Sequence, residues 1–387
     1  MSYSYFSSLV LLACVSIFAA GCGNSSTDID AGNTEDAGTE DAGTEDAGTE
    51  DAGTEDAGTE DAGTEDAGTE DAGTEDAGTE DAGTEDAGTE DAGTEDAGTE
   101  DAGTEDAGGG DTGLEIDFAE VPAGTYQVGS PLNEVGREGD DFPLHDVTLT
   151  HAFQIGITEV TQAFFEQVTG YNPSYTDETH FLCAECPVDS VTWHQAAEFT
   201  NLLSEAAGQS LCYTCTGEGL DLSCEPAGSP YECNGCRLPT EAEWEIAARA
   251  GTNAAFPNGG NLVAGTEYQL TGPVTLDNNE LLDSFAWYRN NSGDHPHEVG
   301  TLDPNDFELY DVVGNLTEWC HDWYHANTGN DGAQEDPYGP PTGEYRINRG
   351  GSYNMGQPYL RLAYRNWYDP IDAYFVIGLR PARTIIP

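Results

Sequence analysis

The chain has 387 residues and a formal net charge of −64 at pH 7, because 74 acidic residues face ten arginines and no lysine. This balance excludes the basic face that nucleic-acid binding requires, so we expect no nucleic acid among the partners. It favours a cation-rich environment or a positively charged partner.

Residues 1–22 read as a signal peptide that takes no part in the fold. The apolar run Phe6–Ala20 is too short for a comfortable membrane span. The following Gly21-Cys22 completes a sequence that resembles the lipobox of bacterial lipoproteins, where the cysteine matching Cys22 is lipidated. No Lys or Arg precedes the apolar run, so the start of the chain is misassigned or the signal is weak. A cleaved secretory signal is the alternative. Both interpretations predict export, and the lipobox adds a lipid anchor in the bacterial cell envelope, at the surface or in the periplasm.

Residues 23–113 form a low-complexity stalk in which Thr34–Gly108 holds fifteen copies of Thr-Glu-Asp-Ala-Gly. Each copy carries two acids and no large apolar side chain, so the tract cannot bury enough surface to offset the entropy lost on ordering. We expect a disordered, self-repelling spacer with a span of roughly 50 Å. It would hold the following domain away from a membrane.

Residues 114–387 are long enough for one domain with its own core. Helix start and stop signals predict three helices, at Gln162–Thr169, Trp193–Ala207 and Glu241–Ala250, with Thr161, Thr192 and Thr240 as their caps. Short strands are predicted near 121–126, 346–349 and 377–380, with two more inside Asp146–Ile157. This mixture predicts an α+β domain with much irregular structure.

Six of the ten arginines lie in the last 42 residues of the chain. They are Arg346, Arg349, Arg361, Arg365, Arg380 and Arg383. In so acidic a domain we predict that most of them pair with carboxylates inside the fold.

The domain contains eight cysteines, namely Cys183, Cys186, Cys212, Cys215, Cys224, Cys233, Cys236 and Cys320. An even number in an exported chain predicts disulfides first. Two Cys-x-x-Cys pairs, beginning at Cys212 and Cys233, also have the spacing of a zinc ribbon, so zinc is the alternative. In either case residues 209–236 form a Cys-rich insertion. Because it holds five cysteines, we predict at least one disulfide partner outside it, or else one free thiol.

Several motifs, taken in order, resemble the formylglycine-generating enzyme (sulfatase-modifying factor) family. The motifs are Glu159-Val-Thr161, Val191-Thr-Trp193, Arg237-Leu-Pro-Thr-Glu-Ala-Glu-Trp-Glu245, Gly314-Asn-x-x-Glu-Trp319, Arg349-Gly-Gly-Ser-Tyr353 and Gly378-Leu-Arg380. The resemblance covers Val121–Arg383. It implies the fold of that family, a C-type-lectin-like α+β fold with little regular secondary structure.

The segment Leu309–Tyr324 combines acidic side chains with a Gly-Asn turn. A hard cation such as Ca²⁺ needs carboxylates together with carbonyl oxygens that a bent chain aims inward. The resemblance implies a structural calcium held at the positions of Asp311, Gly314, Leu316 and Glu318. From spacing alone, a polar surface turn leading into a Trp-anchored helical turn is the competing interpretation.

The resemblance also locates the family's active site, and there this chain departs from the pattern. The family oxidises a sulfatase cysteine with copper held by two of its own cysteines, a soft ligand pair that suits Cu(I). The matching positions here are Met355 and Leu360, although Ser352 of the active site remains. Thr317 stands where the family often has Trp. We therefore expect no copper site at this place.

Histidines offer little other chemistry. His295 and His297 lie in Asp-His-Pro-His-Glu and could bind a metal, but a polar loop is the commoner explanation. His321 and His325 have the spacing of one helical face.

Two functions are open. The first is a surface-displayed, non-catalytic family member that binds a protein, peptide or glycan ligand, since function can be grafted onto loops of such a scaffold. The second is an oxidoreductase of the same superfamily with a non-standard site, such as His295/His297 or the pair Cys183–Cys186.

Overall fold

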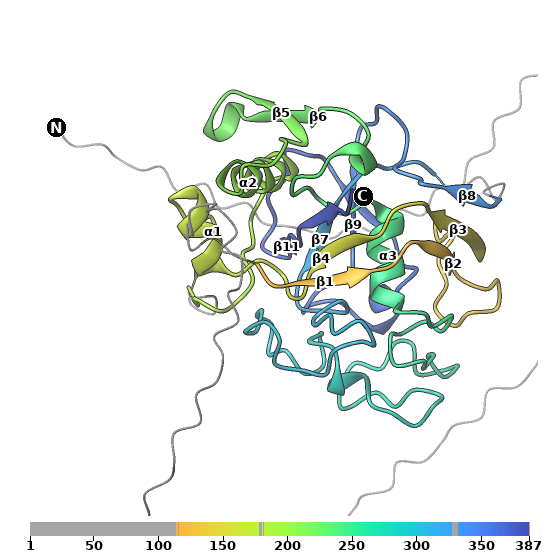
Figure 1. Ribbon diagram of the computed structural model, residues 1–387. Coiled ribbons are helices and arrows are strands. Elements are labelled where there is room, and N and C mark those ends of the chain that lie inside the picture. Colours follow the sequence, from red (N-terminus) through yellow and green to blue (C-terminus); the bar gives the residue numbers. More distant parts are fainter. Residues whose placement is uncertain (1–113, 115, 178–179, 181, 327–331, 387) are drawn as a thin grey trace, which may run out of the picture. The chain divides into compact units, whose positions relative to one another are not determined.

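The computed structural model describes residues 114, 116–177, 180, 182–326 and 332–386 (Figure 1). The predicted signal peptide, Cys22 and the repeat stalk lie outside these residues. Across the described ranges, no helix is long and apolar enough to cross a membrane.

Three α-helices begin at the predicted caps: α1 (Gln162–Thr169), α2 (Trp193–Ala206) and α3 (Glu241–Arg249). The hydroxyl of Thr161 accepts a hydrogen bond from the backbone of α1, and α2 and α3 both begin with complete capping boxes. The latter two helices end one residue earlier than predicted, at C-caps Ala207 and Ala250.

Twelve short strands form four small sheets. The central sheet has the order β10 (Asn366–Tyr368), β9 (Arg346–Arg349), β7 (Thr317–Trp323) and β11 (Ile377–Gly378). A second sheet has the order β1 (Phe118–Val121), β4 (Phe153–Gly156) and β12 (Ala382–Thr384). A third has the order β2 (Gly124–Val128), β3 (His145–Leu149) and β8 (Gln334–Glu335). The fourth is the hairpin of β5 (Tyr213–Thr216) and β6 (Ser223–Pro226). Four short 3-10 helices complete the elements: Gly219–Asp221, Pro230–Glu232, Leu282–Ser284 and Gln357–Leu360. The α+β prediction with little regular structure is confirmed.

The helical turn predicted after the Gly-Asn turn is wrong, because this segment is strand β7. It pairs antiparallel with β9, where Glu318 lies opposite Arg349, and parallel with β11. Six of its seven residues are buried, so the alternating pattern that marks a half-exposed strand is missing from the sequence. As a further correction, His321 and His325 do not share a helical face.

Strand β7 separates two hydrophobic cores. The side chains of Trp319 and Cys320 are both fully buried, but they belong to different cores. Trp319 packs with α2 and the Cys-rich insertion, whereas Cys320 packs with α3 and the β2–β3 pair. This follows from strand geometry, since successive side chains point to opposite faces. Figure 1 accordingly shows α1 and α2 on one side of β7 and α3 on the other.

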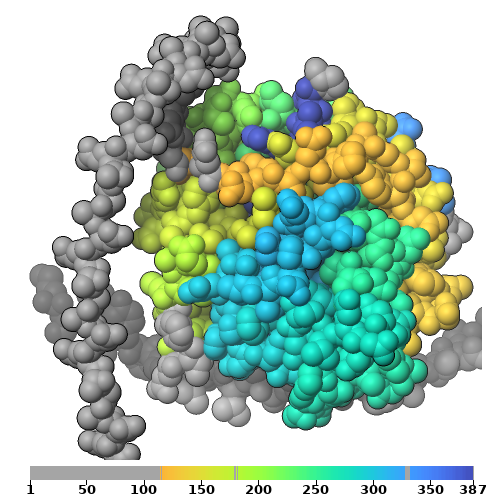
Figure 2. Space-filling view, turned by 60° about the horizontal axis from the view of Figure 1, so that its bottom comes forward, coloured from red at the N-terminus to blue at the C-terminus, as the bar shows by residue number. Residues whose placement is uncertain are grey.

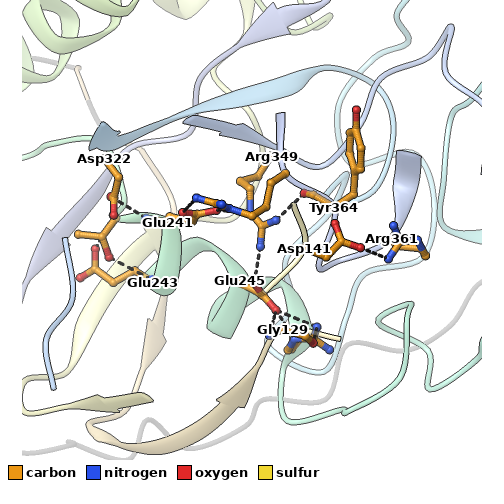
Figure 3. Close-up of polar contacts among 12 residues, drawn as sticks. Gly129, Asp141, Glu241, Glu243, Glu245, Asp322, Arg349, Arg361 and Tyr364 are labelled. Atoms are coloured by element: carbon orange, nitrogen blue, oxygen red, sulfur yellow. Dashed lines mark hydrogen bonds and ion pairs between the residues drawn. The ribbon is translucent and has the colours of Figure 1, made fainter. Parts of the chain in front are cut away.

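Buried ion pairs connect these layers, as the clustering of arginines predicts. Figure 3 shows α3 presenting Glu241 and Glu245 to Arg349 of β9, with Arg361 paired to Asp141 nearby. The remaining buried pairs are Arg237–Glu243, Arg249–Glu245, Arg361–Glu134, Arg365–Glu241 and Arg380–Glu318. In each of these pairs a carboxylate compensates the charge of a buried guanidinium, so this network fixes how the layers meet.

Six of the eight cysteines form disulfides: Cys183–Cys186, Cys212–Cys233 and Cys215–Cys224. The expected link from the insertion to an outside cysteine is wrong, and the alternative of one free thiol is confirmed. That thiol is Cys236, which is buried, as is Cys320 in β7. Three of the four sulfurs of the zinc-ribbon alternative are therefore engaged in disulfides.

Candidate functional site

The predicted calcium segment surrounds a buried guanidinium. Arg380 donates to Glu318 Oε1 from Nη2 at 2.7 Å, and Trp244 donates to the other oxygen of the same carboxylate at 2.6 Å. Asp311 accepts a hydrogen bond from the amide of Gly300 at 2.7 Å, and burial raises the pKa of its carboxyl to about 6.

A third acid, Glu159, joins this cluster. It accepts hydrogen bonds from the Asn315 side chain at 2.7 Å and from the Leu316 amide at 2.9 Å. Burial, and then the neighbouring carboxylate of Asp311, hold its pKa well above the usual range. No group of three or more His, Cys, Asp or Glu side chains in the described ranges is arranged as metal ligands. An ion at Asp311 and Glu318 would therefore have to share the latter with Arg380, and calcium stays a prediction.

This turn requires a glycine because the backbone of another segment approaches it closely. Gly314 has φ of 81°, and a Cβ atom there would lie 2.1 Å from the carbonyl oxygen of Trp287. The turn therefore holds the segment containing Trp287 directly against the start of β7.

The positions predicted from the resemblance as the active site contain no pair of cysteines. Ser352 is buried, and its hydroxyl bonds the side chain of Asn354 at 3.0 Å. Leu360 is fully buried in the core beside α3, and Met355 packs against the same core. The free thiols do not replace the pair, because Cys320 lies in that core and Cys236 in the other.

A pocket of about 310 Å³ does gather the other candidates. Its walls come from two segments far apart in sequence, which Figure 2 shows side by side in yellow-green and light blue. The lining residues are Gln162, Tyr175, His180, Cys183, Cys186, Asp189, Trp287, His295, Pro296, His297, Glu298 and Thr301. Both candidate groups of the oxidoreductase hypothesis, His295/His297 and Cys183–Cys186, therefore line one cavity.

The two histidines are organised by stacking. The rings of Trp287 and His297 lie 3.7 Å apart and nearly parallel, and His295 follows at 4.6 Å from His297. His297 Nε2 donates to the carbonyl of Ser292 at 2.8 Å, and burial lowers its pKa. These contacts favour a neutral imidazole at His297, and the two histidine rings form an aromatic wall of the pocket.

Asp189 places a carboxylate in this wall, with a backbone amide and hydroxyl groups as its hydrogen-bond donors. The side chain is 4% exposed and accepts hydrogen bonds from the amide of Tyr175 and the hydroxyl of Ser190, at 2.9 and 2.8 Å. Burial raises its pKa. All ten arginines contact other groups, and no ion pair in the described part of the chain joins an arginine to Asp189.

An aromatic rim extends from the pocket mouth. The rings of Tyr175 and Phe375 lie 5.5 Å apart, with side chains 44% and 39% exposed. His180 lies 5.7 Å from Phe375 and forms a hydrogen bond of 3.0 Å with the hydroxyl of Tyr353. The rim therefore connects the pocket to the segment that follows Ser352.

The other predicted histidine pair is separated. His321 is buried against the hydroxyl of Tyr213 at 3.1 Å, and burial holds its pKa well below the usual range. The ring of His325 contacts that of Phe142 at a tilt of 41°, with centroids 5.4 Å apart, at the edge of a second hollow of about 670 Å³. Asp322 lines that hollow too, and burial raises its pKa to about 8.

Sequence reasoning missed Asp189 and Trp287 as site residues. Asp189 follows a Pro-Val pair that indicates only a structural role, and Trp287 lies in an irregular stretch without a recognisable motif. Only the fold brings them together, so no local pattern could have identified them.

Residues 114–385 match the family described as sulfatase-modifying factor enzyme 1-like domain. The chain is 29% identical over 265 residues to the chaperone protein LppX of Paenibacillus barcinonensis, which covers 62% of this chain and 82% of LppX. It is 29% identical over 288 residues to the formylglycine-generating enzyme of Thermomonospora curvata, covering 68% and 91% of the two chains. Among solved structures, Treponema denticola variable protein 1 is similar with a TM-score of 0.57 and 29% identity, covering 70% of this chain and 95% of that chain.

Proposed function

This chain belongs to the sulfatase-modifying factor enzyme 1-like family, and from that premise we propose that it is an exported binding module without formylglycine-generating oxidase activity. The observation that carries the proposal is the replacement of the copper-binding cysteines by Met355 and Leu360, the latter fully buried as a core side chain. A Cu(I) site needs two converging soft ligands, and one half-buried thioether does not supply them.

We expect the ligand to bind in the pocket of about 310 Å³ that His295 and His297 line. Its aromatic walls and the aromatic rim offer flat apolar surface, and Asp189 offers a carboxylate that, within the described residues, forms no ion pair with an arginine. A cation held against aromatic faces beside a carboxylate is favourable. We therefore propose a peptide, protein or glycan ligand that carries a positive charge. The similarity to a protein named as a chaperone supports a protein partner.

Display at the bacterial cell envelope completes the proposal. Three disulfides support an oxidising, extracytoplasmic location. The lipid anchor at Cys22 and the acidic spacer of residues 23–113 would then present the domain to partners. Replacement of Cys22 by Ser should release the protein from the membrane fraction, and a variant that stays there would contradict the anchor.

The oxidase part of the proposal has a direct test. The copper-loaded chain is incubated with a Cys-x-Pro-x-Arg peptide, and any aldehyde is trapped with a hydrazide and detected by mass spectrometry. The related enzyme of Thermomonospora curvata is the positive control. We expect no adduct above background. Aldehyde formed with turnover would contradict the proposal.

The binding part is tested on peptide and glycan arrays with the wild-type chain and Asp189→Asn. The asparagine keeps the shape and removes the charge, so we expect cationic ligands to lose at least tenfold in affinity. Glu335→Asn, at an exposed site in β8, serves as the matched control. Equal binding by all three proteins would place the ligand elsewhere.

The second candidate function is an oxidoreductase of the same superfamily. One observation favours it, namely that His295/His297 and the Cys183–Cys186 disulfide line the same pocket. Stoichiometric copper or iron in the purified chain would support a metal-dependent oxidase, whereas calcium alone would support the binding module.

A further inference from the structure

The three disulfides differ in what they can contribute to stability. Cys183 and Cys186 are three residues apart, whereas the other two pairs span 21 and 9 residues. In the chain-entropy description, a disulfide stabilises by restricting the unfolded chain, and a shorter closed loop restricts it less. Reduction of the Cys183–Cys186 bond should therefore lower the free energy of unfolding less than reduction of either other disulfide.

The turn that contains this disulfide is also held by backbone hydrogen bonds that do not depend on sulfur. The bonds run from Cys186 N to Cys183 O, Gln162 N to Cys186 O, Ala163 N to Ala184 O and Val299 N to Glu185 O, at 3.2, 2.9, 3.1 and 2.9 Å. The Cys183 amide also donates to the side chain of Gln162 at 3.1 Å. Two reduced thiols would thus remain neighbours and could close again, which reversible exchange requires.

The surroundings of the two sulfurs are unequal. Both cysteines line the pocket, but Cys183 is partly exposed, whereas Cys186 is only 7% exposed. The carbonyl oxygens of Cys186 and Ala184 accept hydrogen bonds from the first two amides of α1, so the turn is attached to the N-terminal end of this helix. The imidazoles of His295 and His297 lie in the same pocket. An incoming thiol therefore reaches the Cys183 sulfur first.

We infer that Cys183–Cys186 is a thiol–disulfide exchange site that accepts electrons from the dithiol of a partner peptide or protein. The inference deepens the second candidate function by naming its reaction class, and it does not depend on the binding-module proposal. In the first step, a partner thiolate attacks Sγ of Cys183. A mixed disulfide forms, the Cys183–Cys186 bond breaks, and Cys186 leaves as a thiolate that takes up a proton from water.

The second step returns the partner in oxidised form. Its other thiol attacks the partner sulfur of the mixed disulfide and releases Cys183 as a thiol. Two electrons and two protons have then moved from the partner dithiol to Cys183 and Cys186. A low-molecular-weight disulfide, such as glutathione disulfide, reverses the chemistry and regenerates the bond.

The other two disulfides are internal controls for the first experiment. The full chain is equilibrated in glutathione buffers of graded thiol-to-disulfide ratio, quenched with acid, alkylated and mapped by mass spectrometry. We expect Cys183–Cys186 to be half reduced at a ratio at least tenfold less reducing than that needed for Cys212–Cys233 and Cys215–Cys224. Reduction of all three pairs together, or of Cys183–Cys186 last, would overturn the inference.

Single-cysteine variants test the direction of attack. With glutathione disulfide as the probe, Cys186→Ser should form a mixed disulfide at Cys183 at least tenfold faster than Cys183→Ser forms one at Cys186. Circular dichroism of both variants checks that the fold is kept. Equal rates, or a faster reaction at Cys186, would contradict the assigned entry sulfur. The aldehyde assay is independent of both results, so failure here leaves the binding-module proposal standing.

Discussion

At the residue scale, the most demanding feature is the charge buried around Arg380. The guanidinium of Arg380 is fully buried among the carboxyl groups of Glu159, Asp311 and Glu318. Only the last of these forms an ion pair with it, at 2.7 Å. Removing one partner of such a pair is costly because the other charge is left without compensation.

We predict that Glu318→Gln lowers the free energy of unfolding by about 3–5 kcal/mol, because it breaks a buried ion pair. Urea denaturation of the purified domain measures the change. The exposed acid Glu335, changed to Gln, should leave the midpoint within error. A Glu318→Gln midpoint equal to wild type would mean that Arg380 finds another partner.

Calcium is tested at the same cluster. If an ion is bound at Asp311 and Glu318, EDTA should lower the melting temperature, because a ligand that binds only the native state stabilises it by linkage. Asp311→Ala should respond to EDTA less than wild type. An unmoved wild-type curve, or an equal shift in the variant, would rule out this site.

At the scale of elements, the helix starts show how local sequence determines structure. All three caps were predictable, since each needs only a threonine, and for two helices an acid or amide three residues later. Strand β7 was not predictable in the same way, because its burial on both faces depends on partners far along the chain. The pocket was unpredictable for the same reason, since its two walls lie about a hundred residues apart in sequence.

We predict that Thr240→Ala destabilises the domain more than Thr161→Ala. Loss of a threonine N-cap costs about 1 kcal/mol, and Thr240 caps a helix whose Glu243 also binds Arg237 at 2.7 Å through both oxygens. Thr161 caps the shorter α1, whose capping box is incomplete. Chemical denaturation of both variants provides the comparison, and equal losses would show that the cap and the ion pair act independently.

At the scale of the whole molecule, the charge balance sets how stability responds to pH. Asp322 and Asp311 have pKa values raised to about 8 and about 6, and the pKa of Glu159 also lies well above its usual range. In the unfolded chain these groups lose their protons near pH 4. At these three carboxyl groups the folded state therefore binds more protons between about pH 4 and 8, and linkage makes their contribution to stability fall as pH rises through this window. The lowered pKa values of His194, His297 and His321 act in the opposite direction over the lower part of the window.

We predict a higher melting temperature at pH 5 than at pH 8. Below about pH 4 we expect the melting temperature to fall as pH falls. The pKa values of Glu241 and Glu245 are lowered in the fold, so their protonation breaks ion pairs that stabilise the native state. Asp322→Asn removes one of the raised groups, so the difference between pH 5 and 8 should shrink in this variant. A melting temperature that rises steadily from pH 5 to 8 would contradict the prediction.

The placement of β7 between two cores also bears on which changes in length the chain can accept. Deleting a single residue from this strand would exchange its two faces and direct the indole of Trp319 toward the core that now holds the thiol of Cys320. Substitution by a residue of similar size is a milder change. Residues 209–236 are different, because their two disulfides hold them as a unit at the edge of one core. We therefore expect that, as relatives of this chain diverge, insertions and deletions accumulate in such loops while β7 keeps its length.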